Sequence, residues 1–173
     1  MQSEIATAID ARRVAHLVNA AYRGTGGRLG WTHEAGLIAG DRTSSKGVAD
    51  MINDSSMTVL IRRDDRSRAL LGCVAVELND TDHCTISMLA VDPATQRAGV
   101  GGALLADAEQ FAASKGARIT RMTVVRQRDS LIAWYERRGY WQTAALEAFP
   151  YGDDSIGRPR RDDLGFVVLE KIL

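Results

Sequence analysis

The sequence predicts a mixed α/β fold built around one sheet. Three strand-like runs follow one another at residues 57–61, 69–78 and 84–91, and the polar segments between them are typical of antiparallel turns. Beyond residue 100 the apolar residues recur at helical spacing, and helical and strand-like runs then alternate. The chain has 173 residues, of which 45% are apolar, so we expect a single domain over residues 1–173 with a buried core.

Helices are expected before the strands. Residues 10–22 carry apolar side chains at helical spacing, and Asp10 is placed to cap the start of that helix. After a glycine-rich segment, Thr32 is expected to begin a short helix that runs through Ile38. A further short helix is expected over residues 46–53.

The second half of the chain alternates between the two kinds of element. The long apolar helix after residue 100 ends at a lysine and a glycine, which is a common helix terminus. A polar loop with two prolines is long enough to suggest a functional role. The expected elements are a helix to Lys115, a strand over 119–125, a helix begun by Asp129 or Ser130 and ended by Gly139, a strand over 140–146, the loop over 147–164 and a strand over 166–172.

Composition excludes several classes of partner. Lys plus Arg and Asp plus Glu both number 22, so a net charge of zero favours neither nucleic acid nor an anionic membrane as a partner. No apolar run approaches the ~18 residues of a membrane span, and the first residues lack the pattern of a secretory leader. Cys73 and Cys84 are expected to be reduced, packed thiols of a cytoplasmic protein, and no metal site is expected.

The most informative stretch is a glycine-rich connection between a strand and a strong helix. The strand that ends at Val91 is followed by a turn, then by Gly99, Gly101 and Gly102, and then by the helix. Unpaired N–H groups at a helix start attract anions, and residues without a Cβ atom let a diphosphate approach the backbone. Arg97 adds a cation that can pair with phosphate. The stretch therefore suits a pyrophosphate, although a tight turn before a packed helix has a similar composition.

Two other phosphate-binding patterns do not fit this stretch. The chain has no Gly-x-x-x-x-Gly-Lys-Ser/Thr, which excludes a P-loop. Asp92 precedes the glycines, whereas a dinucleotide fingerprint has an acidic residue about 20 positions after them.

Two motifs separated by one strand carry a family resemblance. The first is Q-x-x-G-x-G at residues 96–101, and the second is a helix that ends Y-x-x-x-G-Y at residues 135–140. Together they resemble the GNAT superfamily of N-acetyltransferases, whose later helix usually ends Tyr-x-x-x-Gly-Phe. The resemblance covers about residues 57–146. It implies a single-domain GNAT-like fold, with a mixed, mostly antiparallel sheet of about six to seven strands, helices on both faces, and acetyl-CoA as cofactor.

The chain departs from the family pattern at two places. Arg128 stands where the family often has Asn, seven residues before the helix tyrosine, so a contact from Arg128 to a phosphate is expected in place of the amide contact. Only residues 3–8 are available for the family's first strand.

The resemblance also implies roles in the reaction. An amine would attack the thioester directly, while the strand near Leu89 and Val91 holds the pantetheine arm and splays from the following strand to admit it. Tyr135 would protonate the departing thiolate, since a phenol with a pKa of about 10 stays protonated at neutral pH; the alternative is a core tyrosine. The expected cofactor contacts are Leu89, Ala90, Val91, Gln96, Arg97, Ala98, Gly99, Val100, Gly101, Gly102 and Arg128.

The sequence says less about which residues bind and deprotonate the acceptor amine. Glu34, Glu77 and His83 are candidates for the general base, but each could equally be a surface residue, and water relays could remove the proton instead. The acceptor is expected to contact a helix–loop–helix segment and the loop over 149–164. The candidate contacts in that segment, which could also form an ordinary helix surface, are Tyr22, Trp31, Glu34 and Arg42.

Several functions remain open at this stage. The expected acceptor is a small-molecule primary amine, and the runner-up is a lysine or an N-terminus of a protein. A closed pocket would favour the first, and an open groove the second. A non-catalytic acyl-CoA-binding module and a nucleotide-binding protein are further alternatives. The oligomeric state is open, with a homodimer as one alternative.

Overall fold

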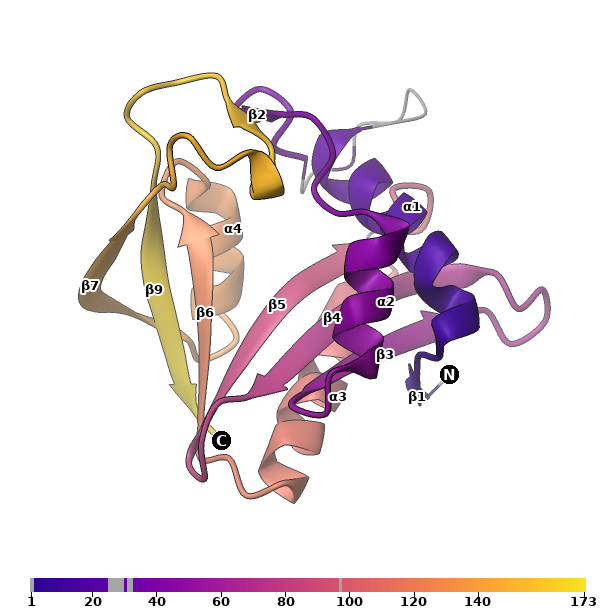
Figure 1. The fold of residues 1–173 in the computed structure, drawn as a ribbon. Coiled ribbons are helices and arrows are strands. Elements are labelled where there is room, and N and C mark those ends of the chain that lie inside the picture. The colour runs from indigo at the N-terminus through magenta and orange to yellow at the C-terminus, as the bar shows by residue number, and fades with distance from the viewer. Residues whose placement is uncertain (1, 25–29, 31–32, 97) are drawn as a thin grey trace.

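A seven-stranded sheet forms the centre of the molecule (Figure 1). The computed structural model describes residues 2–24, 30, 33–96 and 98–173. The strands of this sheet are β1 (Glu4–Ile5), β3 (Met57–Arg63), β4 (Leu70–Leu78), β5 (His83–Val91), β6 (Ile119–Val125), β7 (Trp141–Ala148) and β9 (Gly165–Ile172). Their order is β1-β3-β4-β5-β6-β9-β7, and every neighbouring pair is antiparallel except β5 and β6. The mixed, mostly antiparallel sheet that the family resemblance implied is confirmed.

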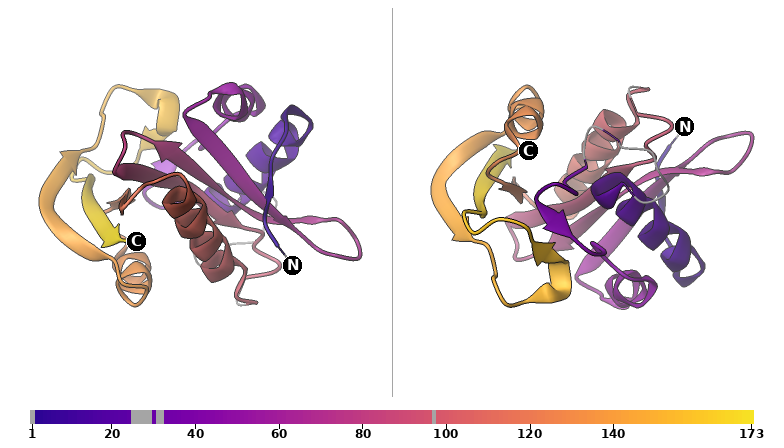
Figure 2. Two further views of the ribbon diagram at one scale, coloured as in Figure 1. Left: turned by 90° about the horizontal axis from the view of Figure 1, so that it is seen from below. Right: turned by 90° about the horizontal axis from the view of Figure 1, so that it is seen from above.

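Helices cover both faces of the sheet (Figure 2). They are α1 (Ala11–Arg23), α2 (Ser45–Asn53), α3 (Val100–Ser114) and α4 (Asp129–Glu136). Successive side chains of a strand point to opposite faces, so each strand serves two cores. In β3, Val59 and Ile61 pack in the core under α1 and α2, whereas Leu60 packs in the core under α3 and α4. The expected helices over 10–22 and 46–53 are therefore confirmed.

The sheet opens between its two parallel strands. β5 and β6 pair only from His83↔Ile119 to Thr85↔Arg121, and beyond that they diverge (Figure 1). Six of the nine residues of β5, from Ile86 to Val91, thus have no partner in β6. The predicted splay of these strands is confirmed, and it leaves a space along the end of β5.

A predicted helix after Thr32 is wrong. Thr32 lies outside the described residues, and β2 (Ile38–Ala39) forms a two-stranded antiparallel sheet with β8 (Arg158–Pro159). The loop expected over 147–164 is also shorter, because β7 continues to Ala148 and a single 3-10 turn precedes β8. β2 and β8 are about 120 residues apart in sequence, so local periodicity carries no signal for their pairing.

One expected helix cap is confirmed in its position, and another is corrected. Asp10 is the N-cap residue of α1, as expected, but its carboxylate makes no hydrogen bond to that helix; it accepts from the backbone N–H of Thr7 (3.0 Å) and pairs with Arg63. Arg128 is the N-cap residue of α4, while Asp129 lies within the first turn. An acidic residue in the first turn also interacts favourably with the helix dipole. The predicted cap at Asp129 was therefore one position too late.

The remaining expectations concern thiols and membranes. Cys73 and Cys84 are free and buried, as expected. Burial raises the pKa of the Cys73 thiol to about 12 and that of Cys84 to about 11, so both are protonated and unreactive at neutral pH. Among the described residues, no helix is long and apolar enough to cross a bilayer, and no cluster of side chains is suited to hold a metal ion.

Candidate functional site

A cavity of about 550 Å³ lies where α3 begins, beside the free end of β5 and against α4. It brings together most of the residues that the glycine motif and the tyrosine motif singled out. The residues that line it are Tyr22, Leu89, Val91, Gln96, Gly99, Val100, Gly101, Gly102, Ser130, Leu131, Trp134, Tyr135, Arg137 and Arg138. A larger open hollow of about 810 Å³ lies between α1, the start of α2 and Pro93, and contains none of these residues.

The glycines form a bare backbone surface at one end of the cavity. Gly99 is the N-cap of α3 with φ 79°, a conformation that favours glycine. The first hydrogen bond across the start of the helix runs from Ala103 N to Gly99 O (3.0 Å), so the amides of Gly101 and Gly102 precede the helical ladder. A Cβ atom on Gly102 would lie 3.6 Å from Arg138 Nη2. This surface offers unpaired N–H groups and a cation to an anion.

Trp134 and Arg138 form the wall opposite the glycines, and sequence reasoning missed both. The Arg138 guanidinium lies 3.6 Å from the centroid of the Trp134 ring, and Arg138 Nη1 donates to Trp134 O (2.9 Å). Burial and the neighbouring Arg137 lower the pKa of Arg138, so a bound anion would relieve an unfavourable environment. Trp134 and Arg138 are four residues apart, a spacing that places an aromatic ring and a cation on the same face of a helix. This spacing was the feature of the sequence that could have identified them.

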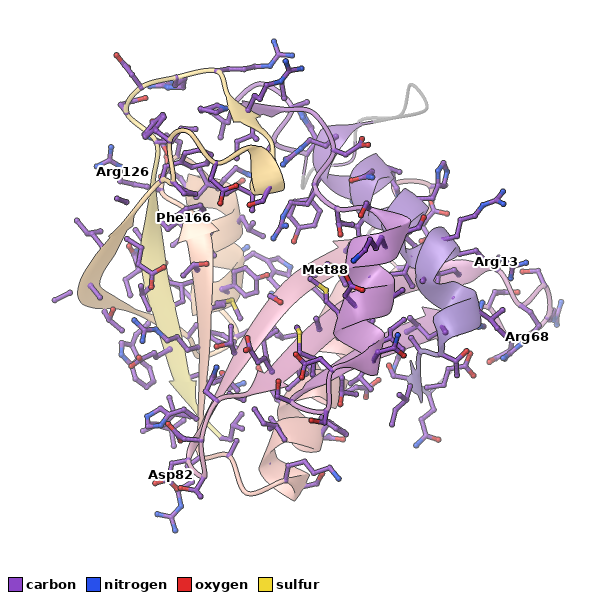
Figure 3. The ribbon with its side chains drawn as sticks, viewed as in Figure 1. Arg13, Arg68, Asp82, Met88, Arg126 and Phe166 are labelled. Atoms are coloured by element: carbon purple, nitrogen blue, oxygen red, sulfur yellow. The ribbon has the colours of Figure 1, made fainter. Side chains whose placement is uncertain are left out.

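The free end of β5 carries a bulge next to the residues of this strand that line the cavity. Met88, labelled in Figure 3, has φ 53°, and the pairing of β4 with β5 shifts register between Cys73 and Ala75. A bulge re-aims the backbone and interrupts the ladder. Leu89 then lines the cavity, and Ala90 points to the opposite face, where it is buried in the core beneath α1.

Two tyrosines from different helices reach this part of the cavity, Tyr22, which is half-buried, and Tyr135, which is buried. The Tyr22 hydroxyl, from α1, donates to the carbonyl of Leu89 (3.1 Å), and burial raises its pKa to about 12. Tyr135, from α4, is only 7% exposed and packs edge-on against Trp134 and Tyr140. Burial, and then the neighbouring Tyr22, raise the pKa of Tyr135 well above its usual value. Both phenols therefore stay protonated at neutral pH.

A buried ionic cluster lies behind the tyrosines. Glu34 pairs with Arg23 through one carboxylate oxygen and lies 3.5 Å from Arg128 Nη1 through the other. Arg23 also donates to the carbonyls of Gly40 (2.8 Å) and Ile156 (2.7 Å). Arg23 thus ties the end of α1 to segments that are distant in sequence.

Those segments form a paired structure that we call the cover, residues 37–40 and 156–160. β2 pairs with β8, and Arg160 N donates to Leu37 O (2.8 Å). Ile38 of the cover packs with Val125, at the end of β6, and with Phe149 and Leu164. The cover therefore lies over the end of the sheet where β5 and β6 diverge (Figure 1).

Loss of the Arg23 side chain is expected to destabilise the fold. Arg23→Gln should lower the free energy of unfolding by about 3 kcal/mol, because it leaves the carboxylate of Glu34 buried with one weaker partner. Urea denaturation would measure the change. Arg12→Gln, an exposed position on the same helix, should stay within about 0.5 kcal/mol of the parent. Equal effects of the two substitutions would contradict the structural role of Arg23.

The structure does not bring every predicted residue to the cavity. Glu77 of β4 pairs with Thr85 of β5, whereas Cys73 pairs with Ala90, which is next to the residues that line the cavity. Glu77 is four residues from Cys73 along β4, a separation of about 13 Å. Ala98 is exposed and is not part of the lining. Arg42 does not line the cavity but packs on Tyr22, which does. The guanidinium carbon of Arg42 lies 5.8 Å from the centroid of the Tyr22 ring. Arg97 and Trp31 lie outside the described residues.

Comparison with known proteins agrees with this geometry. The model of the acetyltransferase (GNAT) family matches residues 29–140. The PaiA N-acetyltransferase of Thermoplasma acidophilum, solved in complex with coenzyme A, has a TM-score of 0.74 at 18% identity, over 100% of both chains. A ribosomal-protein-alanine N-acetyltransferase of Escherichia coli has a TM-score of 0.72 at 18% identity, over 99% of this chain and 92% of that one.

A nourseothricin acetyltransferase is similar over a shorter part, with a TM-score of 0.58 at 22% identity, over 69% of this chain and 66% of that one. A search of curated protein sequences gave no match. At these identities the solved structures establish the fold, and the family match covers well over half of the chain. The chain belongs to the acetyltransferase (GNAT) family and is an acetyl-CoA-dependent N-acetyltransferase.

Proposed function

We propose that the protein acetylates a primary amine of a small molecule, which attacks the thioester directly. The observation that supports this acceptor class is the cover. It joins the two segments expected to border the acceptor, through the pairing of β2 with β8 and the bond from Arg160 N to Leu37 O (2.8 Å). A cover over the end of the sheet beside the cavity suits a small molecule better than a folded protein surface.

The cofactor-binding part of the proposal follows the length of the cavity. The amides of Gly101 and Gly102, together with Arg138, would hold the pyrophosphate. The backbone between Leu89 and Val91 would bind the pantetheine arm in the space that opens beside β5. Acetyl-CoA supplies the activated acetyl thioester, and the bulge at Met88 aims backbone groups of β5 toward the place where its carbonyl would lie.

Tyr135 is the proposed proton donor to the thiolate. It lines the cavity, and its raised pKa keeps the phenol protonated. Tyr22 is the other phenol in reach, but its proton already bonds the carbonyl of Leu89. Tyr22 would therefore fix the Leu89 peptide rather than act as the acid.

Deprotonation of the amine is proposed to proceed through water. Neither Glu34 nor Glu77 lines the cavity, and the carboxylate of Glu34 is engaged by two arginines. Glu34 would thus anchor the acceptor side rather than take up a proton. A cytoplasmic location accords with the two buried, free thiols.

A matched pair of glycine substitutions tests the role of the cover. A Cβ atom on Gly157 would lie 2.6 Å from the carbonyl oxygen of Ala39, whereas one on Gly152, in the same loop and also at positive φ, would meet nothing within 4 Å. Gly157→Ala should raise the KM for a small amine about 10-fold and leave acetyl-CoA affinity unchanged, because only the acceptor end is disturbed. Gly152→Ala should alter neither quantity.

Thiol release from acetyl-CoA over a panel of amines and lysine-containing peptides would provide these measurements. If opening the cover raises turnover of peptides, a protein acceptor is favoured instead. If the protein binds acetyl-CoA by calorimetry but releases no thiol with any amine, the non-catalytic alternative is favoured.

A further inference from the structure

Arg128 is a buried cation that lacks adequate partners. It is 8% exposed, and neither of its terminal NH₂ groups has a hydrogen-bond acceptor among the described residues. Its nearest opposite charge is Glu34, whose oxygen lies 3.5 Å from Nη1, beyond the length of a strong charge-assisted hydrogen bond. Buried guanidinium groups are normally satisfied by carboxylates or carbonyls, so this one has unused binding capacity.

The surrounding cluster carries a surplus of positive charge. Arg23 is fully engaged, because it bonds Glu34 and the carbonyls of Gly40 and Ile156. One carboxylate therefore faces two buried guanidinium groups, and it is closer to Arg23. The excess charge resides on Arg128 and would be neutralised by one further anion.

The pyrophosphate of the cofactor is at the wrong end of α4 to be that anion. Arg128 is the N-cap of the helix, whereas Arg137 is its C-cap and lies with Arg138 in the cavity lining. Arg128 and Arg137 are nine positions apart, which corresponds to about 13 Å along the helix axis. The phosphate contact expected for Arg128 from the sequence would thus have to span the length of α4.

Arg128 does not itself line the cavity, but it lies beside the end where acetyl transfer is proposed, because its carbonyl accepts a hydrogen bond from Leu131 N (2.9 Å) and Leu131 lines the cavity with Tyr135. Glu34, whose carboxylate lies 3.5 Å from Arg128 Nη1, donates its backbone N–H to Tyr22 O (2.8 Å), so Arg128 and Tyr22 meet at the same residue. Burial raises the pKa of both Tyr22 and Tyr135, and the charge of Arg128 opposes that shift.

The Arg128 guanidinium is buried in this conformation. The cover contacts the same ionic cluster, because the carbonyl of Ile156 accepts a hydrogen bond from Arg23 and Ile38 N donates to Glu34 O (3.0 Å). Opening of the cover would therefore give a bound acceptor access to Arg128.

We propose that Arg128 binds a carboxylate of the acceptor, and that the substrate class is amines that also carry a carboxylate, such as amino acids. This inference rests on the proposed function and narrows it. A planar guanidinium matches a carboxylate with two parallel hydrogen bonds, so it would orient the acceptor as well as hold it. The carboxylate would bind beside Glu34, and the amine would point toward Leu89 and Tyr135.

Matched substrates provide the first test. Thiol release from acetyl-CoA would be compared for L-amino acids and their carboxamides, with rates expressed per unprotonated amine because the two series differ in amine pKa. The parent protein should favour the acid over the amide about 100-fold in kcat/KM. Arg128→Gln should lose that preference, and Arg128→Lys should retain part of it. Arg118→Gln, at a side chain 81% exposed on the opposite end of the sheet, should leave it unchanged.

A binding test does not depend on turnover. In the presence of coenzyme A, N-acetylglycine should raise the Tm of the parent protein more than N-acetylglycinamide does at equal ionic strength, and Arg128→Gln should abolish the difference. If acids and amides behave alike with the parent protein in both tests, or if O-phosphoethanolamine is preferred over every carboxylate, the proposal is wrong. It is also wrong if Arg128→Gln weakens coenzyme A binding 10-fold or more, since Arg128 would then serve the cofactor. Absence of thiol release together with the expected Tm difference would count against the proposed function alone.

Discussion

Gly101→Glu abolishes acetyl-CoA binding, with the dissociation constant expected to rise at least ~1,000-fold. A Cβ atom at this position would lie 3.4 Å from Val91 Cγ2 and 3.9 Å from Trp134 Cζ2, so a glutamate side chain must extend into the cavity. Its carboxylate would then occupy the place proposed for the pyrophosphate, where like charges repel strongly in a partly enclosed site. Calorimetric titration with acetyl-CoA measures the loss.

The control for this prediction is Gly36→Glu. Gly36 is exposed, and a Cβ atom there would meet nothing within 4 Å, so the same charge is added without entering the cavity. Circular dichroism would confirm that both variants are folded. Retention of acetyl-CoA binding by folded Gly101→Glu would refute the glycine surface as the phosphate site, and with it the cofactor pose.

Tyr135→Phe is expected to lower kcat about 100-fold while the affinity for acetyl-CoA stays the same. The substitution removes only the hydroxyl, and a positioned proton donor contributes factors of this order. Because burial raises the pKa of Tyr135, the phenol is protonated below pH 10 and its ionisation should not reduce kcat between pH 7 and 9. Single-turnover measurement of thiol release reports the chemical step, and a separate titration reports binding.

Tyr140→Phe is the matched control for the proton donor. Its hydroxyl is also buried, but it donates to Glu109 (3.0 Å) and accepts from Thr120 (3.1 Å), and Tyr140 does not line the cavity. We expect this variant to lose about 1 kcal/mol of stability and to keep its kcat. An unchanged kcat in Tyr135→Phe would remove Tyr135 from the mechanism and leave Tyr22 as the remaining phenol in the cavity.

The cofactor end of the site could be predicted from sequence because its function depends on the backbone. Glycines at a helix start act through the absence of a side chain and through N–H groups that every helix leaves unpaired. These effects depend on a few adjacent residues, Gly99 to Gly102, so the pattern in the sequence is also the geometry in space. Trp134 and Arg138 were missed because an aromatic residue and a cation four apart are common on surface helices.

The acceptor end could not be predicted in the same way. Glu34 was singled out as a base, but its environment is set by Arg23 and Arg128, the second of which is more than 90 residues away. The cover depends on a pairing of two-residue strands, too short for any periodicity to be detected. The expected helix ending at Ile38 was wrong for this reason, since long-range pairing decided the conformation.

The sequence by itself determined the run of antiparallel strands, the helices around them and the glycine surface that begins α3, because each follows from local periodicity or from a contiguous motif. The helices on both faces and the splayed strands were implied by the family resemblance, which the same short motifs carry. Only the tertiary structure decided which charges are neutralised and which are not. The surplus on Arg128 exists because three side chains from separate segments meet in a space that excludes water, where each charge is stabilised only by the groups that the fold places beside it.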